Sequence, residues 1–552
     1  MTPALARPRL ALLMFALLAM LAFALLLHKT NGTTFYFDEW DFILRRHRST
    51  VGTFLEPHNE HFSLVPVIVY KLLFATAGLD NYAPYRIVQL VLHVAVAALV
   101  FTFVRSRAGD VLALGAGALL LFFGAGFEDV LWPFQMGFLL ALACGLGALL
   151  LLERESRVGD LGAMLLLGIS LASASLGIPF AIGAAAYLAW RPARRRRLWV
   201  VAVPVLLYGI WYLDYGHSAL KGENVTAAPA YTAEEVAGAV GGVAGLAVEW
   251  GRTLAVAAVA ALVIHLSRVR QVPRSFAMVL TAAAAFWILT ALARAQLSEP
   301  TSPRYLYAGG FFVLLIAAEA VRGRQLSRRF LYGIAVLVLL ASLSGLHTFE
   351  RGAGGLRETT RIVRAEITPV EIGGEHMARL FAPAPQKAPQ ILAGQYLEAV
   401  RAIGSSPAYT EAELASLPDE ARKHAADGVF VRGYGLRLVP GAPLAAGPAP
   451  GVDAGPSMRV VRRGPCVTAR PIAPRTSGTV ALRLAPGGVS VRAPGAAATL
   501  RRFASGYEGA PTLSGAPDRA VLRIPSDRSD RPWHAQFADA RSITACGLGG
   551  RR

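Results

Sequence analysis

Charged residues are scarce in this sequence: Asp, Glu, Lys and Arg make up 16% of its 552 residues, whereas hydrophobic types make up 54%. Soluble globular chains carry about 25% charged residues, so the composition excludes an ordinary soluble protein. The sequence also lacks a Walker motif, a dinucleotide-binding fingerprint and an established metal-ligand spacing. It therefore gives no sign of an enzyme that holds a nucleotide in a soluble domain.

Long apolar runs stand where the charges are missing. The first, LALLMFALLAMLAFALLL (10–27), contains no charge, and as a helix it would span the roughly 30 Å hydrocarbon core of a bilayer. A signal peptide is the alternative, because Arg7 and Arg9 precede the run. The run is too long for the apolar part of a signal peptide, and no cleavage site follows Leu27. We therefore expect a retained membrane helix in a multi-pass protein of the inner membrane.

The net charge of +19 would suggest nucleic acid as a partner of a soluble protein. Here the arginines cluster in short gaps between apolar runs, at Arg7 and Arg9, Arg105 and Arg107, Arg154 and Arg157, Arg191 and Arg194–Arg197, Arg268, Arg270 and Arg274, and Arg322, Arg324, Arg328 and Arg329. This is the positive-inside pattern of membrane proteins. It predicts membrane lipids, and not nucleic acid, as the partner of these arginines.

The arginine-rich gaps alternate with other gaps, and this alternation predicts the topology. We expect about eleven transmembrane helices near 10–27, 84–104, 111–125, 133–152, 161–175, 178–190, 198–213, 252–267, 275–293, 305–321 and 330–346. The N-terminus is then cytoplasmic, and everything after Leu346 is extracytoplasmic. The run 62–77 is short and contains Pro66 and Lys71, so we expect an interfacial or re-entrant helix in a long first outer loop.

Acids, histidines, amides and aromatic residues concentrate in the outer gaps. The stretch FYFDEWDF (35–42) presents Asp38, Glu39 and Asp41 just after the first membrane helix. A carboxylate close to a bilayer is costly unless it is paired, solvated or functional. One of these acids can act as a general base on an acceptor hydroxyl, while its neighbour orients the acceptor. The alternative is the ordinary solvated end of a membrane helix.

Two histidines lie three residues apart in EPHNEHF (56–62), at His58 and His61. On a helix this spacing would place both rings on one face, where they can bind a divalent cation. Hydrogen bonding at an interface is the alternative, and the sequence leaves metal binding open.

Other outer residues suit an anionic or sugar ligand. Arg304 begins an apolar run on the side where arginine is otherwise rare, so its partner is either a phosphate or lipid headgroups. A second cluster can stack on a sugar and hydrogen-bond to it, or can belong to an interfacial aromatic belt; its members are Glu128, Asp129, Trp132 and Gln135.

The composition changes after Leu346. Residues 351–430 mix charges with helical patterns, including a capping box at Thr410 and Glu413. Residues 431–552 are rich in Gly, Pro and Ala and contain short alternating segments such as TVALRLA. These patterns predict a membrane module (1–350), a helical linker region (351–430) and a β-rich domain (431–552) with a β-sandwich. Cys466 and Cys546 both lie in this last domain, which suggests a disulfide.

These features together resemble the GT-C superfamily of membrane glycosyltransferases. The acidic pair (38–39), the long first outer loop with its interfacial helix, and the stretch HF…P…YKLLFATAGLDNYAPYRIVQLVLH (61–93) are similar to the first-loop pattern of protein O-mannosyltransferases and lipid A aminoarabinose transferases. The resemblance covers about residues 1–350. It implies a polytopic α-helical, GT-C-like module followed by an extracytoplasmic α+β region.

The resemblance implies inverting transfer of a sugar from a polyprenyl-phosphate donor to an acceptor on the outer face. Asp38 would be the catalytic base, Glu39 would support the acceptor, and Arg304 with Lys71 or Arg86 would hold the lipid phosphate. The acceptor would be a cell-envelope glycan, lipid or protein. The full predicted substrate-binding set is Asp41, His58, His61, Lys71, Arg86, Glu128, Asp129, Trp132, Gln135, Arg304 and Tyr305. No cofactor is implied beyond the divalent cation left open above.

Two other classes of function compete with a transferase. A transporter or flippase of lipid-linked glycans usually carries ionisable groups near mid-membrane and two matching halves, and neither is evident in the sequence. A membrane anchor for an exported binding domain leaves the polar residues of the outer gaps unexplained.

Overall fold

The structure is a computed structural model of the chain. It describes residues 8–189, 192–441, 447–473, 476–484, 487–493, 495–514 and 518–548. The chain divides into two units. The first contains residues up to Thr33, Arg48–Ala77 and Asn81–Arg357, and the second contains Thr34–His47, Gly78–Asp80 and the residues from Glu358 onwards. Each unit is described by itself.

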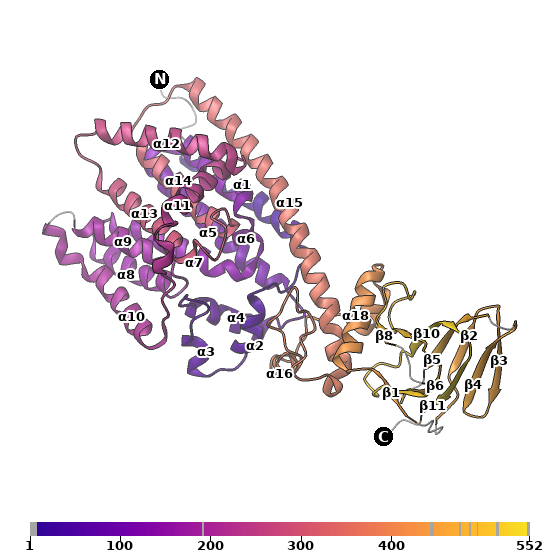
Figure 1. Ribbon diagram of the computed structural model, residues 1–552. Helices are drawn as coiled ribbons and strands as arrows, with labels where there is room; N and C mark the ends of the chain where they lie inside the picture. Colours follow the sequence, from indigo (N-terminus) through magenta and orange to yellow (C-terminus); the bar gives the residue numbers. More distant parts are fainter. Residues whose placement is uncertain are drawn as a thin grey trace. The chain divides into compact units, whose positions relative to one another are not determined.

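The first unit is a bundle of helices (Figure 1). Within the described residues, seven helical segments are long and apolar enough to cross a membrane, which makes the chain a membrane protein. They contain α1 (Pro8–Lys29), α5 (Ala83–Leu121), α7 (Met136–Leu152), α10 (Trp199–Tyr215), α12 (Val248–Arg268), α13 (Arg274–Arg294) and α15 (Arg328–Gly373).

Shorter helices complete this unit. They are α3 (Val51–Leu55), α4 (Leu64–Thr76), α6 (Phe127–Leu131), α8 (Arg157–Leu171), α9 (Gly177–Ala189), α11 (Ala228–Val243) and α14 (Pro303–Ala320), with 3-10 turns η1 (Gly124–Gly126), η2 (Pro133–Gln135), η3 (Pro192–Arg197) and η4 (Gly222–Asn224). The predicted interfacial segment 62–77 is helical as α4; its place at the interface stays a prediction.

The prediction of eleven spans is not confirmed. Each predicted span falls on a helix, but α8 and α9 have 15 and 13 residues. At 1.5 Å per residue they reach only about 20 Å, less than a hydrocarbon core. Two predicted spans, 84–104 and 111–125, lie on α5, which is kinked at Gly109 (φ 82°). The helix α14 is not among the seven.

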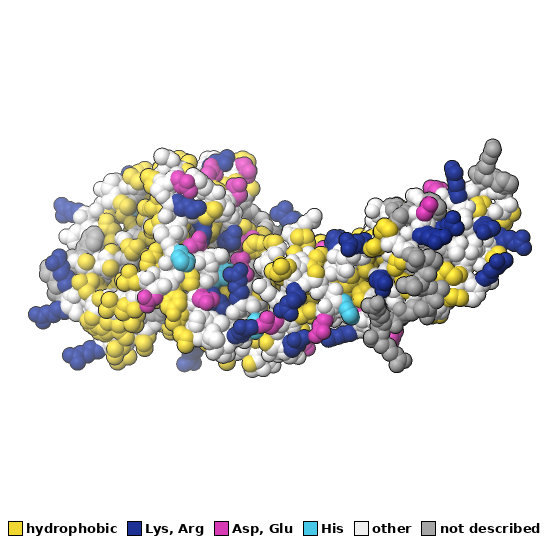
Figure 2. All heavy atoms as spheres, turned by 60° about the horizontal axis from the view of Figure 1, so that its bottom comes forward, with side chains coloured by type: hydrophobic (Ala, Val, Ile, Leu, Met, Phe, Trp, Pro, Cys, Tyr) yellow, Lys and Arg dark blue, Asp and Glu magenta, His cyan; other side chains and the backbone are white. Residues whose placement is uncertain are grey.

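Apolar side chains face outwards on several of the long helices. Leu206 and Leu213 of α10, Val256 of α12 and Leu337 of α15 are each more than half exposed. Figure 2 shows such yellow side chains covering much of the visible surface over the helices. A soluble fold would bury them, whereas in a membrane they contact lipid tails.

The second unit contains α2 (Glu39–Arg46), the end of α15, η5 (Gly374–His376), α16 (Ala393–Ile403), α17 (Glu411–Ser416) and α18 (Glu420–Gly433). The predicted capping box is confirmed, since Thr410 Oγ1 accepts from Glu413 N and the Glu413 carboxylate accepts from Thr410 N. The segment 34–47 was expected with the membrane module. It packs in this unit through the buried Trp40, whose ring meets Tyr396 edge-on with centroids 6.2 Å apart.

Two antiparallel sheets form the β-rich region. The six-stranded sheet has the order β1-β9-β6-β11-β4-β3, and the five-stranded sheet has the order β2-β5-β10-β7-β8. The strands are β1 (Leu438–Pro440), β2 (Gly451–Ala454), β3 (Met458–Arg463), β4 (Cys466–Pro471), β5 (Gly478–Leu484), β6 (Val489–Arg492), β7 (Ala498–Arg501), β8 (Thr512–Leu513), β9 (Ala520–Leu522), β10 (Trp533–Ala540) and β11 (Ile543–Gly547). That the sheets form a sandwich stays a prediction.

A disulfide joins Cys466 of β4 to Cys546 of β11, with an S–S distance of 2.03 Å. The two residues are also cross-strand partners in the six-stranded sheet. The bond therefore fastens two neighbouring strands that lie 80 residues apart in the sequence.

Candidate functional site

The acidic stretch after α1 is held in a defined conformation in the second unit. Phe37 has a positive φ of 42°, and its carbonyl oxygen accepts a hydrogen bond of 2.6 Å from Gln390 Nε2. A non-glycine residue rarely adopts such a φ, and it persists only where the surroundings enforce it. The chain therefore presents the next residue, Asp38, from a fixed turn.

The three acids of this stretch have different surroundings. Asp38 is half-buried and precedes α2 as its N-cap residue. Glu39 is fully buried, and its Oε2 accepts a hydrogen bond of 2.9 Å from Tyr36 N. Asp41 lies 3.5 Å from Arg45, one helical turn further on. This arrangement favours Glu39 as the residue that shapes the turn.

In the first unit the two predicted histidines do not lie on a helix. The main chains of His58 and His61 hydrogen-bond to each other in both directions, at 3.1 and 3.0 Å, across a tight turn in which Asn59 has φ 50°. The His58 ring packs against Phe134, and the His61 ring packs against Phe138. The helical spacing assumed for a metal site is therefore absent at these residues.

This turn lies at one end of a cavity of about 450 Å³ in the first unit. The Glu60 carboxylate accepts two hydrogen bonds from the guanidinium of Arg294, at 3.1 and 2.8 Å. The neighbouring His61 ring hydrogen-bonds through Nδ1 to Ser175 Oγ at 2.9 Å. These groups form the polar end of the cavity.

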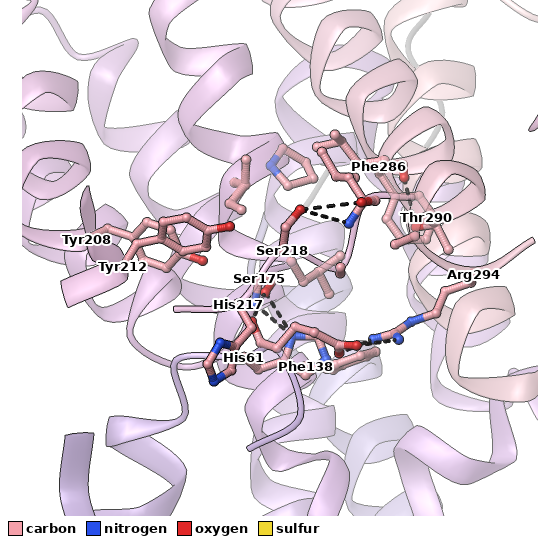
Figure 3. A pocket seen from close by; sticks show the side chains of 18 of the residues that line it. His61, Phe138, Ser175, Tyr208, Tyr212, His217, Ser218, Phe286, Thr290 and Arg294 are labelled. Carbon is pink, nitrogen blue, oxygen red and sulfur yellow. Dashed lines mark hydrogen bonds and ion pairs between the residues drawn. The ribbon is translucent and has the colours of Figure 1, made fainter. Parts of the chain in front are cut away.

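Aromatic and aliphatic side chains form most of the remaining wall. Figure 3 shows Tyr208 and Tyr212 of α10 on one side and Arg294 with Thr290 of α13 on the other. The rings of Tyr208 and Tyr212 stack at 6.4 Å between centroids. Further lining residues are Phe138, Leu176, Ile178, Pro179, Val205, His217, Ser218, Phe286, Leu289 and Tyr305. An elongated apolar ligand with a polar head would match this lining.

Two titratable groups at the polar end are shifted in the same direction. Burial lowers the pKa of His61 to about 4, and the charge of Arg294 adds to this effect. Burial alone would raise the pKa of Glu60, but the hydrogen bonds and charge of Arg294 outweigh it and the pKa is lowered. At neutral pH the cavity therefore contains a neutral imidazole beside a closed ion pair.

Two predicted residues meet at the start of α14. Tyr305 lines the cavity. Arg304 is half-buried, and its guanidinium carbon lies 5.6 Å from the centre of the Tyr305 ring. Its charge acts on both His61 and Asp129. Arg304, which was predicted as a cation at the outer start of a helix, therefore lies near this cavity.

The predicted cluster at 128–135 lies mostly inside the bundle. Asp129, Trp132 and Gln135 are each at most 4% exposed, and Gln89 Nε2 donates to the Asp129 carbonyl oxygen. Trp132 stacks on Phe134 with centroids 5.2 Å apart. The stacking contact favours a structural role for Trp132. Glu128 is half-buried.

Two other predicted phosphate ligands contact main-chain oxygens. Lys71 Nζ donates to Arg48 O at 2.5 Å and lies 4.5 Å above the Phe54 ring. Arg86 donates to Leu27 O and to the side chains of Thr30 and Asn31 at the end of α1. Both cations thus support local structure in this conformation.

Sequence reasoning missed Glu60 and Arg294 as site residues. Arg294 ends an apolar run on the side where the positive-inside pattern leaves arginine unexplained. The same signal selected Arg304 and could have selected Arg294. Tyr208 and Tyr212 gave no such signal, because tyrosines at a helix end are common interfacial residues.

Comparison with known proteins gives one structural similarity. No family model matches the chain, and a search of curated proteins finds no significant match. Among solved structures the chain is similar to ArnT from Cupriavidus metallidurans, in its crystal structure bound to undecaprenyl phosphate. The TM-score is 0.47 and the identity 13%, covering 70% of this chain and 84% of that chain.

ArnT is a GT-C aminoarabinose transferase, and aminoarabinose transferases are one of the two branches that the sequence resembles. Because the TM-score is below 0.5 and the identity is low, the function of this chain has to be inferred from its own residues.

Proposed function

We propose that the chain is an integral membrane glycosyltransferase that transfers a sugar from a polyprenyl-phosphate donor to an acceptor hydroxyl at the outer face of the membrane. The observation that carries the proposal is the cavity with aromatic and aliphatic walls and a polar end formed by Glu60, His61 and Arg294. A lipid-linked sugar has an apolar chain and a polar head. The lining of this cavity likewise combines apolar walls with a polar end.

In the proposed reaction Asp38 is the general base. The acceptor oxygen attacks the anomeric carbon opposite the phosphate, and its proton passes to the Asp38 carboxylate. The bond between the anomeric carbon and the phosphate oxygen breaks, so polyprenyl phosphate leaves and the configuration inverts. Glu39 positions the base, because its buried carboxylate holds the main chain at Tyr36.

The leaving phosphate needs cationic stabilisation. We assign this role to Arg304, which is half-buried near the cavity residue Tyr305. Arg294 suits it less, because Glu60 already neutralises its charge. Lys71 and Arg86 suit it less because they donate to main-chain oxygens.

The test is turnover by the purified full-length chain in liposomes with a panel of labelled polyprenyl-phosphate sugars. Asp38→Asn is expected to lower kcat by about 100-fold or more, as loss of a general base does, while donor binding persists. Asp41→Asn is the matched control, because it removes the same charge three residues further on. The same assay with and without a chelator tests whether turnover needs a divalent cation.

Other outcomes would indicate a different base or a different function. Turnover lost in Asp41→Asn but kept in Asp38→Asn would move the base to Asp41. Donor that crosses the bilayer without sugar transfer would support a flippase instead. Binding of a glycan without transfer or transport would support an anchored binding protein.

A further inference from the structure

The five-stranded sheet has one buried and one outward face. Val480, Leu482, Ala535 and Phe537 are at most 1% exposed on the inner side. Because successive residues of a strand point to opposite faces, Arg483 of β5, His534 of β10 and Arg501 of β7 lie on the other side, and these are exposed or half-buried.

The strand register places these three residues side by side. His534 is the cross-strand partner of Arg483 on one side and of Arg501 on the other. Directly opposed residues have Cβ atoms about 5 Å apart. We call these three residues the Arg-His-Arg row. The next residue along the row, on β2, is Gly451, which contributes no charge.

The adjacent row on the same face is polar. It runs from Asp453 of β2 through Ala481 to Gln536, Thr499 and Thr512. The hydroxyls of Thr499 and Thr512 lie 3.0 Å apart. Amide and hydroxyl groups therefore adjoin the cationic row and can hydrogen-bond to a neutral part of the same ligand.

The two arginines of the row flank His534, one on each neighbouring strand. Arg501 is fixed in place, since it donates to Ala504 O at 2.8 Å and its guanidinium carbon lies 4.7 Å from the centre of the Tyr507 ring. Burial, followed by the charges of Arg501 and Arg483, lowers the pKa of His534 below its usual 6.5. An anion above the row would be attracted by both arginines.

The side chains on this face indicate which kind of anion it can bind. Among the described residues of β2, β5, β7, β8 and β10, no large apolar side chain is exposed. Insertion into lipid or stacking on nucleic-acid bases would need such side chains.

We propose that this face binds an acidic polysaccharide, with Arg483 and Arg501 on the oxygens of its carboxylate or phosphate and with Gln536 and Thr499 on its hydroxyls. Guanidinium groups suit both anions because their donors match two oxygens at once. The proposal does not depend on the glycosyltransferase activity, since binding at this face needs no reaction.

The test is the affinity of full-length protein in phosphatidylcholine nanodiscs for oligogalacturonate. Arg483→Ser with Arg501→Ser is expected to weaken binding about tenfold or more, because hydrogen bonds to charged groups contribute that much. The matched control is Arg459→Ser with Arg470→Ser, an exposed arginine pair opposed across β3 and β4 of the other sheet. It removes the same charge and is expected to change the affinity less than about twofold.

Methyl-esterified oligogalacturonate tests whether the acid is recognised, because it keeps the sugar and masks the charge. The ester is expected to bind the wild-type protein more weakly than the acid does, by about the same factor by which the double variant weakens binding of the acid. Equal weakening by both arginine pairs would mean unspecific attraction and overturn the proposal. So would equal binding of the ester, or binding of anionic vesicles through the row without binding of the saccharide.

His534 supplies a second readout that does not depend on removing arginine. A bound anion stabilises the imidazolium, so binding takes up a proton and tightens as pH falls from 8 to 5. Among the described residues, the charges of Arg501 and Arg483 act on His534, and Asp453 and Tyr507 lie further along the same face. His534→Gln is expected to flatten the dependence. If the affinity of the wild-type protein stays constant or falls as the pH is lowered from 8 to 5, His534 and the Arg-His-Arg row are not part of the binding site.

Discussion

His61 lies at the polar end of the cavity with its ring between Ser175 and Phe138. Its pKa of about 4 in the folded chain compares with 6.5 for an unburied histidine. Between these values the unfolded chain binds a proton that the folded chain does not. The folded state therefore loses stability as pH falls from 6.5 towards 4.

His61→Gln is expected to remove part of this loss, because glutamine keeps a hydrogen-bonding group for Ser175 and does not titrate. The measurement is the midpoint of thermal unfolding in detergent at pH 7, 6, 5 and 4.5. His217→Gln is the control, since His217 lines the same cavity with an exposed ring. An identical slope for wild type and His61→Gln would contradict the burial of His61.

At the scale of elements, the main chain of α15 comes very close to the main chain at the end of α5. A Cβ atom on Gly345 would lie 1.8 Å from Phe122 O, and one on Gly124 would lie 2.3 Å from Gly345 O. The two main chains therefore touch, as they do where small residues join helices in membranes. Glycine at both positions is what permits this contact.

Gly345→Ala is expected to destabilise the bundle by about 1–3 kcal/mol, the range for overpacking. Gly333→Ala is the matched control in the same helix, because a Cβ atom there meets nothing within 4 Å. Alanine favours a helix by about 1 kcal/mol over glycine, so the control is expected to be neutral or stabilising. Unfolding in detergent and mild denaturant measures both, and equal effects would argue against the contact.

The elements also show what the sequence could predict. Hydropathy located the seven long apolar helical segments of the described residues, because apolar length indicates a membrane segment. The spans predicted at α8 and α9 are not confirmed, because these helices have only 15 and 13 residues. Sequence also does not distinguish a buried aromatic ring, such as that of Trp132, from an exposed one. Glu60 and Arg294 lie 234 residues apart, and only the fold brings them together.

At the scale of the whole molecule, the arginine pattern predicts which loops face the cytoplasm. Gln271 is exposed between α12 and α13 and is flanked by Arg268, Arg270 and Arg274. Gly222 is exposed in the loop after α10, where arginine is absent. The positive-inside rule places these two loops on opposite sides of the membrane.

Cysteine labelling tests this topology. In a Cys144→Ala background, Gly222→Cys is expected to react with an impermeant maleimide on intact cells. Gln271→Cys is expected to react only after permeabilisation. The reverse pattern would invert the topology and place the proposed reaction on the cytoplasmic side.

The position of β11 in its sheet has a consequence for biogenesis. β11 is the last strand of its sheet to be synthesised, yet it lies between β6 and β4. Among the described strands, β11 is the one that joins the β3–β4 hairpin to the rest of that sheet. At 5–20 residues per second, the 80 residues from Cys466 to Cys546 take on the order of ten seconds to translate. During that interval Cys466 is a thiol whose disulfide partner has not yet been made.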